Sequence, residues 1–245
     1  MLYSHNIKKV SILLRGQHYQ HENDISKKKW LGSFFDIYKN FEKMILNPLQ
    51  KRFETEIYIS SWNSPVEQEL QKISNNIILH SMENFDKKGY QQTNIIHNGL
   101  NLIPENKNDL IIILRFDLLY KKPITDWVPF NKKFDICLPW RGSGLGPKSI
   151  WKKAKIISDF FFIIKNNKNN LNKFKKTILE NKKRNYELHW IYPSLIKKKL
   201  KIIFADNGFY PSKSCTKHKP NPIYINYNRP YHFNDVNIND LIDGI

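Results

Sequence analysis

The sequence predicts a single α/β domain built on a mainly parallel sheet that is flanked by helices. Short apolar runs of strand length recur through the first half of the chain, at residues 9–14, 56–62, 76–80 and 109–114. Stretches with helical spacing of their apolar residues alternate with these runs. Strands that are apolar throughout are usually covered on both faces, so this alternation favours a doubly wound, mainly parallel sheet.

The first strand is expected at residues 9–14, where a run with β-branched side chains ends at the loop sequence Arg15-Gly16-Gln17. Between residues 34 and 53 apolar side chains recur every three or four positions, which predicts a helix with one buried face. Pro48 is expected to kink or end this helix, because proline has no backbone N–H.

Two more strands precede the strongest one. Residues 56–62 and 76–80 are predicted as the second and third strands, with a helix that opens at Pro65 between them. A helix is expected over 93–103, and it leads to residues 109–114, the most hydrophobic strand of the chain.

The second half is less regular. Its expected elements are, in order, a strand-like segment at 134–140, a glycine-rich loop at 141–147 that is a candidate lid, a strand at 156–164, a basic helix at 171–179, a helix at 187–195 and a final strand at 200–204. From Pro211 the Pro, Asn and Tyr content predicts an irregular tail. We therefore divide the chain into a domain over residues 1–210 and an irregular C-terminal tail over 211–245, packed on the domain or extending from it.

Charge and cysteine content limit the classes of function. The net charge of +18 predicts attraction to polyanions: nucleic acid, an anionic membrane surface or a phosphorylated ligand. Most of the excess lies between residues 148 and 201, which hold 16 Lys/Arg and 3 Asp/Glu. Cys137 and Cys215 are far apart in sequence and have no second Cys or close His at zinc-like spacing, so neither a disulfide framework nor a structural metal is implied. The apolar stretch near the N-terminus is too short for a signal peptide or a membrane span, so we expect a cytoplasmic protein. In one interpretation the protein is also peripheral to a membrane.

The loops that follow the predicted strands are the candidate ligand site, because ligands of parallel sheets bind beyond the carboxyl ends of the strands. They are residues 15–17, 61–63 and 115–117. At the last of them Asp117 is suited to hold a divalent cation that bridges a diphosphate, and Arg115 to neutralise a phosphate oxygen. The same tripeptide is equally well explained as an Arg–Asp pair or a turn cap.

Several short motifs occur in an order that resembles bacterial and viral glycosyltransferases that decorate capsules and surface glycans. These motifs are Leu14-Arg15-Gly16-Gln17, Tyr58-Ile59-Ser60-Ser61-Trp62, Gln91-Gln92 with Gly99-Leu100, Leu114-Arg115-Phe116-Asp117, and Ser158-Asp159-Phe160-Phe161-Phe162. Together they span roughly residues 9 to 205. The resemblance implies a GT-A-like, Rossmann-like fold and a nucleotide-sugar donor held near the loop of the first strand.

The resemblance also implies roles for single residues. The donor-binding candidates are Arg15, Gly16, Gln17, Trp62, Arg115 and Asp117. Asp117 is the metal-ligand candidate for Mn²⁺ or Mg²⁺, but Arg115 stands where relatives have the first Asp of an Asp-x-Asp motif. One carboxylate binds a divalent ion more weakly than two, so metal dependence stays open.

Asp159 is the preferred candidate for the base that would activate an acceptor hydroxyl on a glycan, a lipid-linked molecule or a protein, and His189 is the alternative, as the base or as a diphosphate contact. Structural explanations exist for each candidate: a cap for Asp159, packing for His189, a core position for Trp62 and a tight turn for Gly16. Arg141 is a weaker candidate, as part of the lid.

Two other functions remain open. The basic C-terminal half and its interleaved aromatic residues are compatible with a nucleic-acid-binding protein or nuclease, although no helix-turn-helix, zinc-finger or RNA-recognition motif is present. A catalytically inactive, glycosyltransferase-like scaffold is the other. The basic clusters at 182–184 and 197–199 are either a solvated surface or a contact for anionic lipid.

Overall fold

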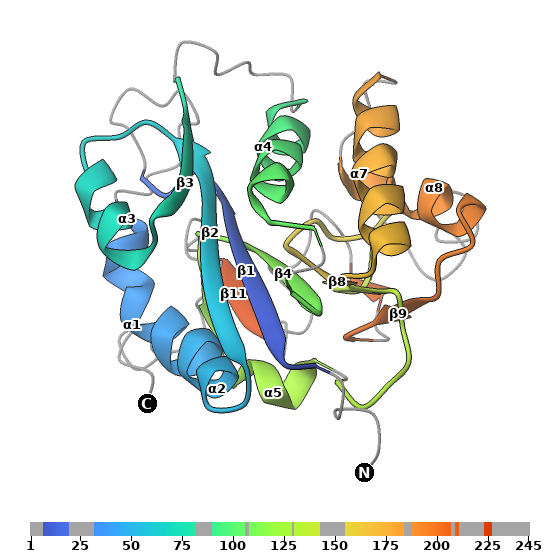
Figure 1. Cartoon of the computed structure of the whole chain (residues 1–245), viewed down its shortest axis with the longest axis horizontal. Coiled ribbons are helices and arrows are strands. Elements are labelled where there is room, and N and C mark those ends of the chain that lie inside the picture. The colour runs from blue at the N-terminus through green and yellow to red at the C-terminus, as the bar shows by residue number, and fades with distance from the viewer. Residues whose placement is uncertain are drawn as a thin grey trace.

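The computed structural model describes residues 7–19, 32–81, 90–105, 108–128, 130–142, 155–183, 188–206, 209–210 and 223–226. Within them seven strands form one sheet in the order β3-β2-β1-β4-β8-β6-β9. Their bounds are β1 Lys9–Gly16, β2 Glu54–Trp62, β3 Asn76–His80, β4 Leu110–Arg115, β6 Ile136–Leu138, β8 Phe161–Lys165 and β9 Ile202–Phe204. The α/β fold with a mainly parallel sheet flanked by helices is confirmed (Figure 1).

The pairing of the strands creates a topological switch point beside β1. Strand β1 pairs in parallel with β2 on one side and with β4 on the other, and β2 pairs in parallel with β3. Strand β8 is antiparallel to both β4 and β6, while β6 and β9 are parallel. The chain thus builds outward from β1 to β3 and then resumes at β4 on the opposite side of β1. Such a reversal is where ligands bind in open α/β sheets.

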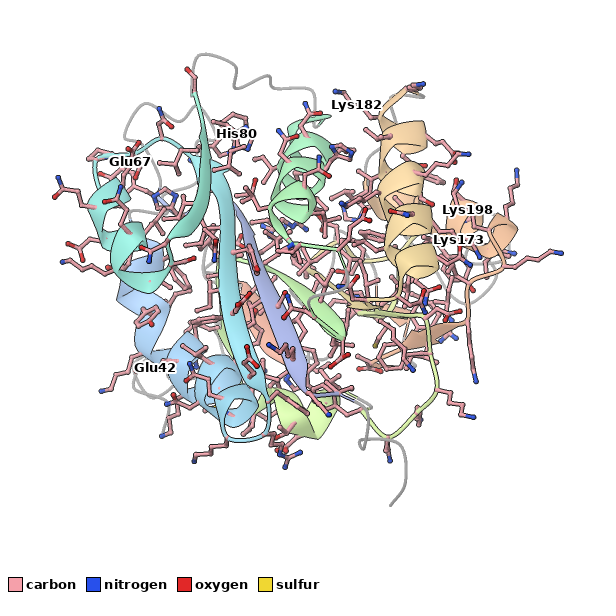
Figure 2. The ribbon with its side chains drawn as sticks, in the orientation of Figure 1. Glu42, Glu67, His80, Lys173, Lys182 and Lys198 are labelled. Atoms are coloured by element: carbon pink, nitrogen blue, oxygen red, sulfur yellow. The ribbon has the colours of Figure 1, made fainter. Side chains whose placement is uncertain are left out.

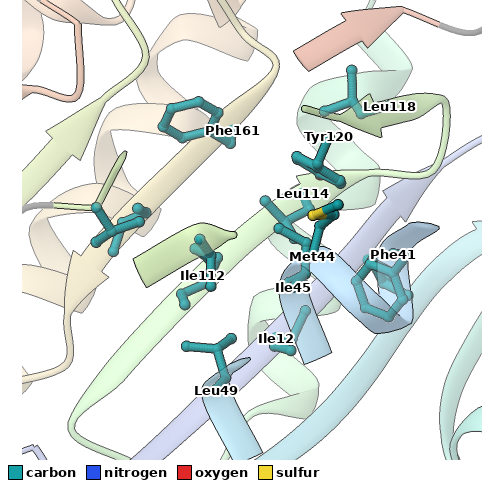
Figure 3. Packing of buried hydrophobic residues seen from close by; sticks show 14 of the residues in the cluster. Ile12, Phe41, Met44, Ile45, Leu49, Ile112, Leu114, Leu118, Tyr120 and Phe161 are labelled. Carbon is teal, nitrogen blue, oxygen red and sulfur yellow. The ribbon is translucent and has the colours of Figure 1, made fainter. Parts of the chain in front are cut away.

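One face of the sheet packs on a long helical segment. This segment consists of the 3₁₀ helix η1 (Phe34–Ile37), α1 (Tyr38–Phe41), the π-helix η2 (Glu42–Leu46) and α2 (Asn47–Gln50). Its side chains Phe41, Ile45 and Leu49 join Ile12 and Ile112 of the sheet in one buried cluster (Figure 3). The helical segment continues past Pro48 to Gln50. Pro48 has no N–H to donate to the backbone carbonyl of Met44, so the ladder of i→i−4 hydrogen bonds is interrupted there. The π-helical turn η2 lies just before this interruption.

The other face is covered by α4 (Tyr90–Leu102) and α7 (Lys168–Lys183), followed by the 3₁₀ helix η4 (Leu188–Trp190) and α8 (Tyr192–Lys197). Helix α4 lies very close to the sheet at Gly99, where an added Cβ would come within 2.7 Å of Leu13 Cδ1 and 2.8 Å of Ser60 Cβ. Gly99 therefore permits the close packing of this helix on the sheet. Phe174 and Ile178 of α7 fill the remainder of this face.

The remaining elements are short. Helix α3 (Glu67–Ile73) connects β2 to β3, and α5 (Ile124–Trp127) follows β5 (Leu118–Tyr120). Asn40 bonds the backbone of Tyr120 twice, accepting from its N–H at 2.7 Å and donating to its carbonyl at 2.9 Å. These bonds attach β5 to the helical segment just after the Arg115-Phe116-Asp117 turn. Sequence patterning missed both β5 and α5.

Several predicted bounds were wrong. The strand expected over 156–164 is confined to β8, which begins at Phe161, and the helix expected over 187–195 is divided between η4 and α8. Strand β9 is not the last one: β10 (Phe209–Tyr210) pairs with β7 (Arg141–Gly142), and β11 (Tyr224–Asn226) pairs with β5. These pairings involve partners far away in sequence, which local patterning does not specify. Residues 143–147 of the candidate lid lie outside the described residues.

Candidate active site

Two arginines stand side by side at the switch point. Arg15 ends the buried part of β1 and Arg115 ends β4, and the two are partners in the parallel register. Register partners in parallel strands point to the same face of the sheet, and Leu13 and Ile113, two residues earlier, belong to the cluster under α4 and α7. The two guanidinium groups therefore lie on the α4/α7 face, at the carboxyl edge of the sheet.

Asp159 reaches these arginines because β8 runs antiparallel to β4. Phe161, the first residue of β8, is paired with Leu114, so the residues that precede β8 lie at the carboxyl edge of β4. Arg15 Nη2 donates to the backbone carbonyl of Asp159 and is 3.7 Å from its Oδ2. Arg115 Nη1 is 3.8 Å from Oδ1 of the same carboxylate. One buried carboxylate thus lies between two guanidinium groups.

Asp117 forms a two-pronged ion pair with Arg115. Arg115 Nε donates to Asp117 Oδ1 at 2.8 Å, and Nη2 donates to Oδ2. The guanidinium carbon of Arg115 also lies 5.1 Å from the centre of the Phe160 ring. This geometry fixes the plane of the guanidinium group, because a two-pronged pair and a stacked ring each restrict its rotation. The Arg–Asp pair considered from the sequence is therefore present.

The positive surroundings keep Asp159 ionised. Burial by itself would raise the pKa of this carboxyl group, but the charges of His189, Arg115 and Arg15 outweigh burial and lower its pKa from 3.8 to about 2. Burial also lowers the pKa of Arg15 from 12.5 to about 10, with Asp159 opposing that shift. At neutral pH both groups are charged.

His189 also lies close to Asp159. Its Nδ1 is 2.8 Å from the carbonyl oxygen of Ile157, and its own backbone carbonyl accepts from the N–H of Ile157 at 3.0 Å. A carbonyl can only accept, so Nδ1 carries a proton, and in the neutral imidazole the lone pair is on Nε2. Nε2 is 3.8 Å from Asp159 Oδ1. The ring is therefore oriented with its basic nitrogen toward the charged cluster.

Burial divides these residues into two layers. Arg15, Asp117 and Asp159 are at most 3% exposed, whereas the side chains of Arg115 and His189 are 17% and 35% exposed. The three buried side chains can orient Arg115 and His189 and set the local charge without touching a ligand. Arg115 and His189 are the members of the cluster that a bound molecule would reach.

The remaining predicted residues, Gly16, Gln17, Trp62 and Arg141, lie at or next to strand ends. Gly16 has a φ of +102°, which favours glycine, and its carbonyl accepts from Ser61 Oγ at 2.7 Å. Gln17 follows it and is partly buried. Trp62, at the end of β2, is 6% exposed, with its ring centre 5.6 Å from that of His80. Trp62 thus packs within the fold. The guanidinium carbon of Arg141 lies 4.1 Å from the centre of the Phe204 ring.

Sequence reasoning assigned no role to two residues of this edge. Gln92 of α4 accepts from Arg15 Nη1 at 3.2 Å, and so ties the helix to the buried arginine. His18 is buried, with its ring nitrogens against Ser61 Oγ and, at 2.7 Å, Ser64 Oγ. His18 thereby joins the loop that follows β1 to the end of β2 and to the loop after it. The position of His18 directly after the predicted strand-end loop was the only available signal.

A divalent metal ion does not fit the side chains present. Both oxygens of Asp117 accept hydrogen bonds from Arg115, and Asp159 lies within 4 Å of Arg15, Arg115 and His189. The described residues hold no group of three or more His, Cys, Asp or Glu side chains that could bind a metal ion. The single-carboxylate site expected at Asp117 therefore already has a cation, the guanidinium of Arg115.

No family model and no curated protein matches the sequence. The structure matches solved glycosyltransferases of bacterial and viral origin. Streptococcus pneumoniae glycosyltransferase GlyE is 16% identical with a TM-score of 0.44, over 80% of this chain and 45% of that one, so this chain spans about half the length of GlyE. A glycosyltransferase involved in glycosylation of the major capsid of PBCV-1 is 10% identical with a TM-score of 0.42, over 80% of each chain.

A third similar structure has a different activity in its name. A nucleoside-diphosphate-sugar pyrophosphorylase from Vibrio cholerae is 14% identical with a TM-score of 0.47, over 95% of this chain and 99% of that one. These are likenesses of fold, and none assigns a substrate to this chain. Among the described helices, none is long and apolar enough to cross a membrane.

Proposed function

We propose that this protein is a nucleotide-sugar-dependent glycosyltransferase that moves a sugar to a hydroxyl group of a glycan, lipid-linked or protein acceptor. One observation carries the proposal: Arg115 and His189, the two accessible members of a buried charged cluster, each lie 3.8 Å from Asp159 Oδ1 at the switch point of the sheet. A cation and a proton acceptor at the carboxyl edge are the two groups that such a transfer needs.

Arg115 would stabilise the leaving nucleoside diphosphate. Sugar transfer breaks the bond between the anomeric carbon and the diphosphate oxygen, so negative charge grows on that oxygen in the transition state. A guanidinium group that is already oriented stabilises this charge without having to reorganise. Asp117 and Phe160 provide that orientation for Arg115.

His189 suits the role of base better than Asp159 does. A carboxylate whose pKa is lowered to about 2 is a weak proton acceptor at neutral pH, and the Asp159 side chain is 5% exposed, whereas that of His189 is 35% exposed. Nε2 of His189, the ring nitrogen left to accept a proton, can take the proton of the acceptor hydroxyl as that oxygen attacks the sugar. The carboxylate of Asp159, 3.8 Å away, would then stabilise the imidazolium that forms.

The proposal is tested with the full chain by thermal unfolding in the presence of UDP, GDP and dTDP, in buffer with EDTA. At a ligand concentration of about 100 times its Kd, binding to the native state adds about 2.7 kcal/mol of stability. For a chain of this size we expect Tm to rise by roughly 5 to 10 °C with at least one nucleotide.

Arg115→Ala should abolish that rise, and Arg52→Ala is the matched control, because Arg52 is an exposed arginine just before β2, at the opposite edge of the sheet. If no nucleotide raises Tm, and the chain instead binds single-stranded nucleic acid with steep salt dependence, the nucleic-acid-binding function replaces this one.

We also propose that the basic face of α7 contacts an anionic membrane surface, which would bring the site to a lipid-linked acceptor. Leu179 is 38% exposed on α7, and the positions three and four residues away on either side are all lysines: Lys175, Lys176, Lys182 and Lys183. Trp190 of η4 and Ile196 of α8 are also exposed. Lys182 and Lys198 lie on the side of the molecule that carries α7 and α8, whereas Glu42 and Glu67 lie on the opposite side (Figure 2). Exposed apolar side chains among lysines are typical of surfaces that bind anionic lipid.

Sedimentation with phosphatidylserine-containing vesicles tests this contact. Reversing two charges with Lys176→Glu and Lys183→Glu should weaken binding at least tenfold, since each lysine near such a surface contributes about 1 kcal/mol. Lys39→Glu with Lys43→Glu, an exposed pair on the helical segment of the other face, should have a much smaller effect. Equal binding of both double variants, or equal binding to vesicles of phosphatidylcholine alone, would contradict the proposal.

A further inference from the structure

The Arg115-Phe116-Asp117 turn contains a cation where a metal ion would otherwise be needed. We infer that this chain binds the diphosphate of its donor without a divalent metal ion, and that the guanidinium group of Arg115 takes the place of the metal. The inference rests on the proposed function, because it concerns how the same site holds its leaving group.

The first argument is the geometry of Asp117. A metal ion would need the carboxylate of Asp117 as a ligand, yet both of its oxygens accept hydrogen bonds from Arg115. The side chain of Asp117 is 4% exposed, so it has little contact with water that could deliver a hydrated ion. Mg²⁺ in particular loses its water shell reluctantly and usually keeps several waters in protein sites.

The second argument is charge. The second carboxylate of the edge, Asp159, lies 3.7 Å from Arg15 and 3.8 Å from Arg115, with His189 also at 3.8 Å. A divalent cation that approached either carboxylate would therefore meet guanidinium groups at short range, in a buried region where screening by solvent is weak. Two carboxylates that are each neutralised by arginine do not attract a second cation strongly.

The third argument is the accessibility of Arg115. Of the two arginines, Arg15 is 1% exposed and supports Asp159, whereas the Arg115 side chain is 17% exposed. Guanidinium groups match phosphate oxygens in shape and charge, and they stay protonated under all ordinary conditions. Arg115 thus offers an anion the permanent positive charge that a metal ion supplies elsewhere, already held in place by Asp117.

The inference is tested by measuring nucleoside diphosphate binding to the full chain by calorimetry, once with EDTA and once with Mn²⁺. We expect the affinity for UDP, GDP or dTDP to agree within about twofold between the two buffers. The variant Arg115→Asp, which creates an Asp-x-Asp sequence, should lose at least tenfold in affinity with EDTA and recover binding when Mn²⁺ is added. Binding of Mn²⁺ itself, followed by electron paramagnetic resonance, should appear in the variant and be absent from the wild type.

The outcomes separate this inference from the proposed function. Wild-type binding that requires Mn²⁺ would overturn the inference and leave the glycosyltransferase proposal in place. A lack of nucleotide binding in both buffers would count against the proposed function itself. The comparison of wild-type binding in EDTA and Mn²⁺ needs no variant, so it decides the question even if Arg115→Asp does not fold.

Discussion

Replacement of Asp159 by alanine is expected to lower the free energy of unfolding by about 3 to 5 kcal/mol, measured by urea denaturation at pH 7. The carboxylate is 3% exposed and lies between Arg15, Arg115 and His189. Without it the guanidinium of Arg15, which is 1% exposed, would remain as a buried charge without its carboxylate partner. Removal of one partner of a buried ion pair is costly for this reason.

A double-mutant cycle separates this effect from simple loss of packing. Arg15→Met with Asp159→Ala should cost clearly less than the sum of the two single substitutions, since neither charge is then left unpaired. Asp126→Ala, which removes an exposed carboxylate, should change stability by less than about 0.5 kcal/mol. Additive costs for the Arg15 and Asp159 substitutions would show that the two groups do not interact.

The same carboxylate predicts a dependence of stability on pH. The pKa of Asp159 is lowered from 3.8 to about 2 in the folded chain, so the ionised group stabilises the fold at all pH values above about 4. That contribution, about 2 kcal/mol for a shift of this size, is lost as pH falls toward 2. Wild-type stability should therefore fall more steeply between pH 4 and pH 2 than that of Asp159→Ala. If the free energy of unfolding fell equally steeply with pH in both proteins, the position of Asp159 among positive charges would be contradicted.

Substitution of His189 by alanine is expected to reduce the turnover of sugar transfer by about 10² to 10⁴-fold, the usual contribution of a general base. Nucleotide affinity should stay within a few-fold, because Arg115 and not His189 is proposed to hold the diphosphate. The reason for the loss lies in Nε2, which is the ring nitrogen left to accept a proton when Nδ1 donates to Ile157. The measurement is a steady-state assay with the donor identified by the nucleotide screen.

Two controls distinguish catalysis from a structural role. His97→Ala removes a partly buried histidine of α4 and should leave turnover unchanged. The residual turnover of His189→Ala should depend less on pH than the turnover of the wild type, because the variant lacks the ring nitrogen proposed to accept the proton. A variant that keeps full turnover would return the role of base to Asp159 or to another group.

The strand framework was predictable because it is encoded locally. The runs that became β1, β2, β3 and β4 are rich in apolar and β-branched residues and are separated by segments of helical periodicity, so their type and their order along the chain follow from neighbouring residues. The same reasoning placed Arg115 and Asp117 at the carboxyl edge. It could not decide whether they pair with each other or bind a ligand, since both arrangements use the same two residues.

Long-range pairing decided the rest of the site. Asp159 meets Arg115 only because β8 lies antiparallel beside β4, which brings together residues 44 positions apart. His189 reaches the cluster through its two bonds to Ile157, and Gln92 through the packing of α4 on the sheet. None of these contacts has a local signature, because register and helix docking depend on the whole core and not on nearby residues.

By itself, the sequence determined that this chain forms a doubly wound α/β sheet with a charged turn at its central carboxyl edge. Only the tertiary structure decided that Arg115 occupies both oxygens of Asp117, that Asp159 is buried among cations, and that Arg115 and His189 are the accessible groups. The physical reason is that residue type sets which charges are available, while burial and distance set their ionisation and their partners.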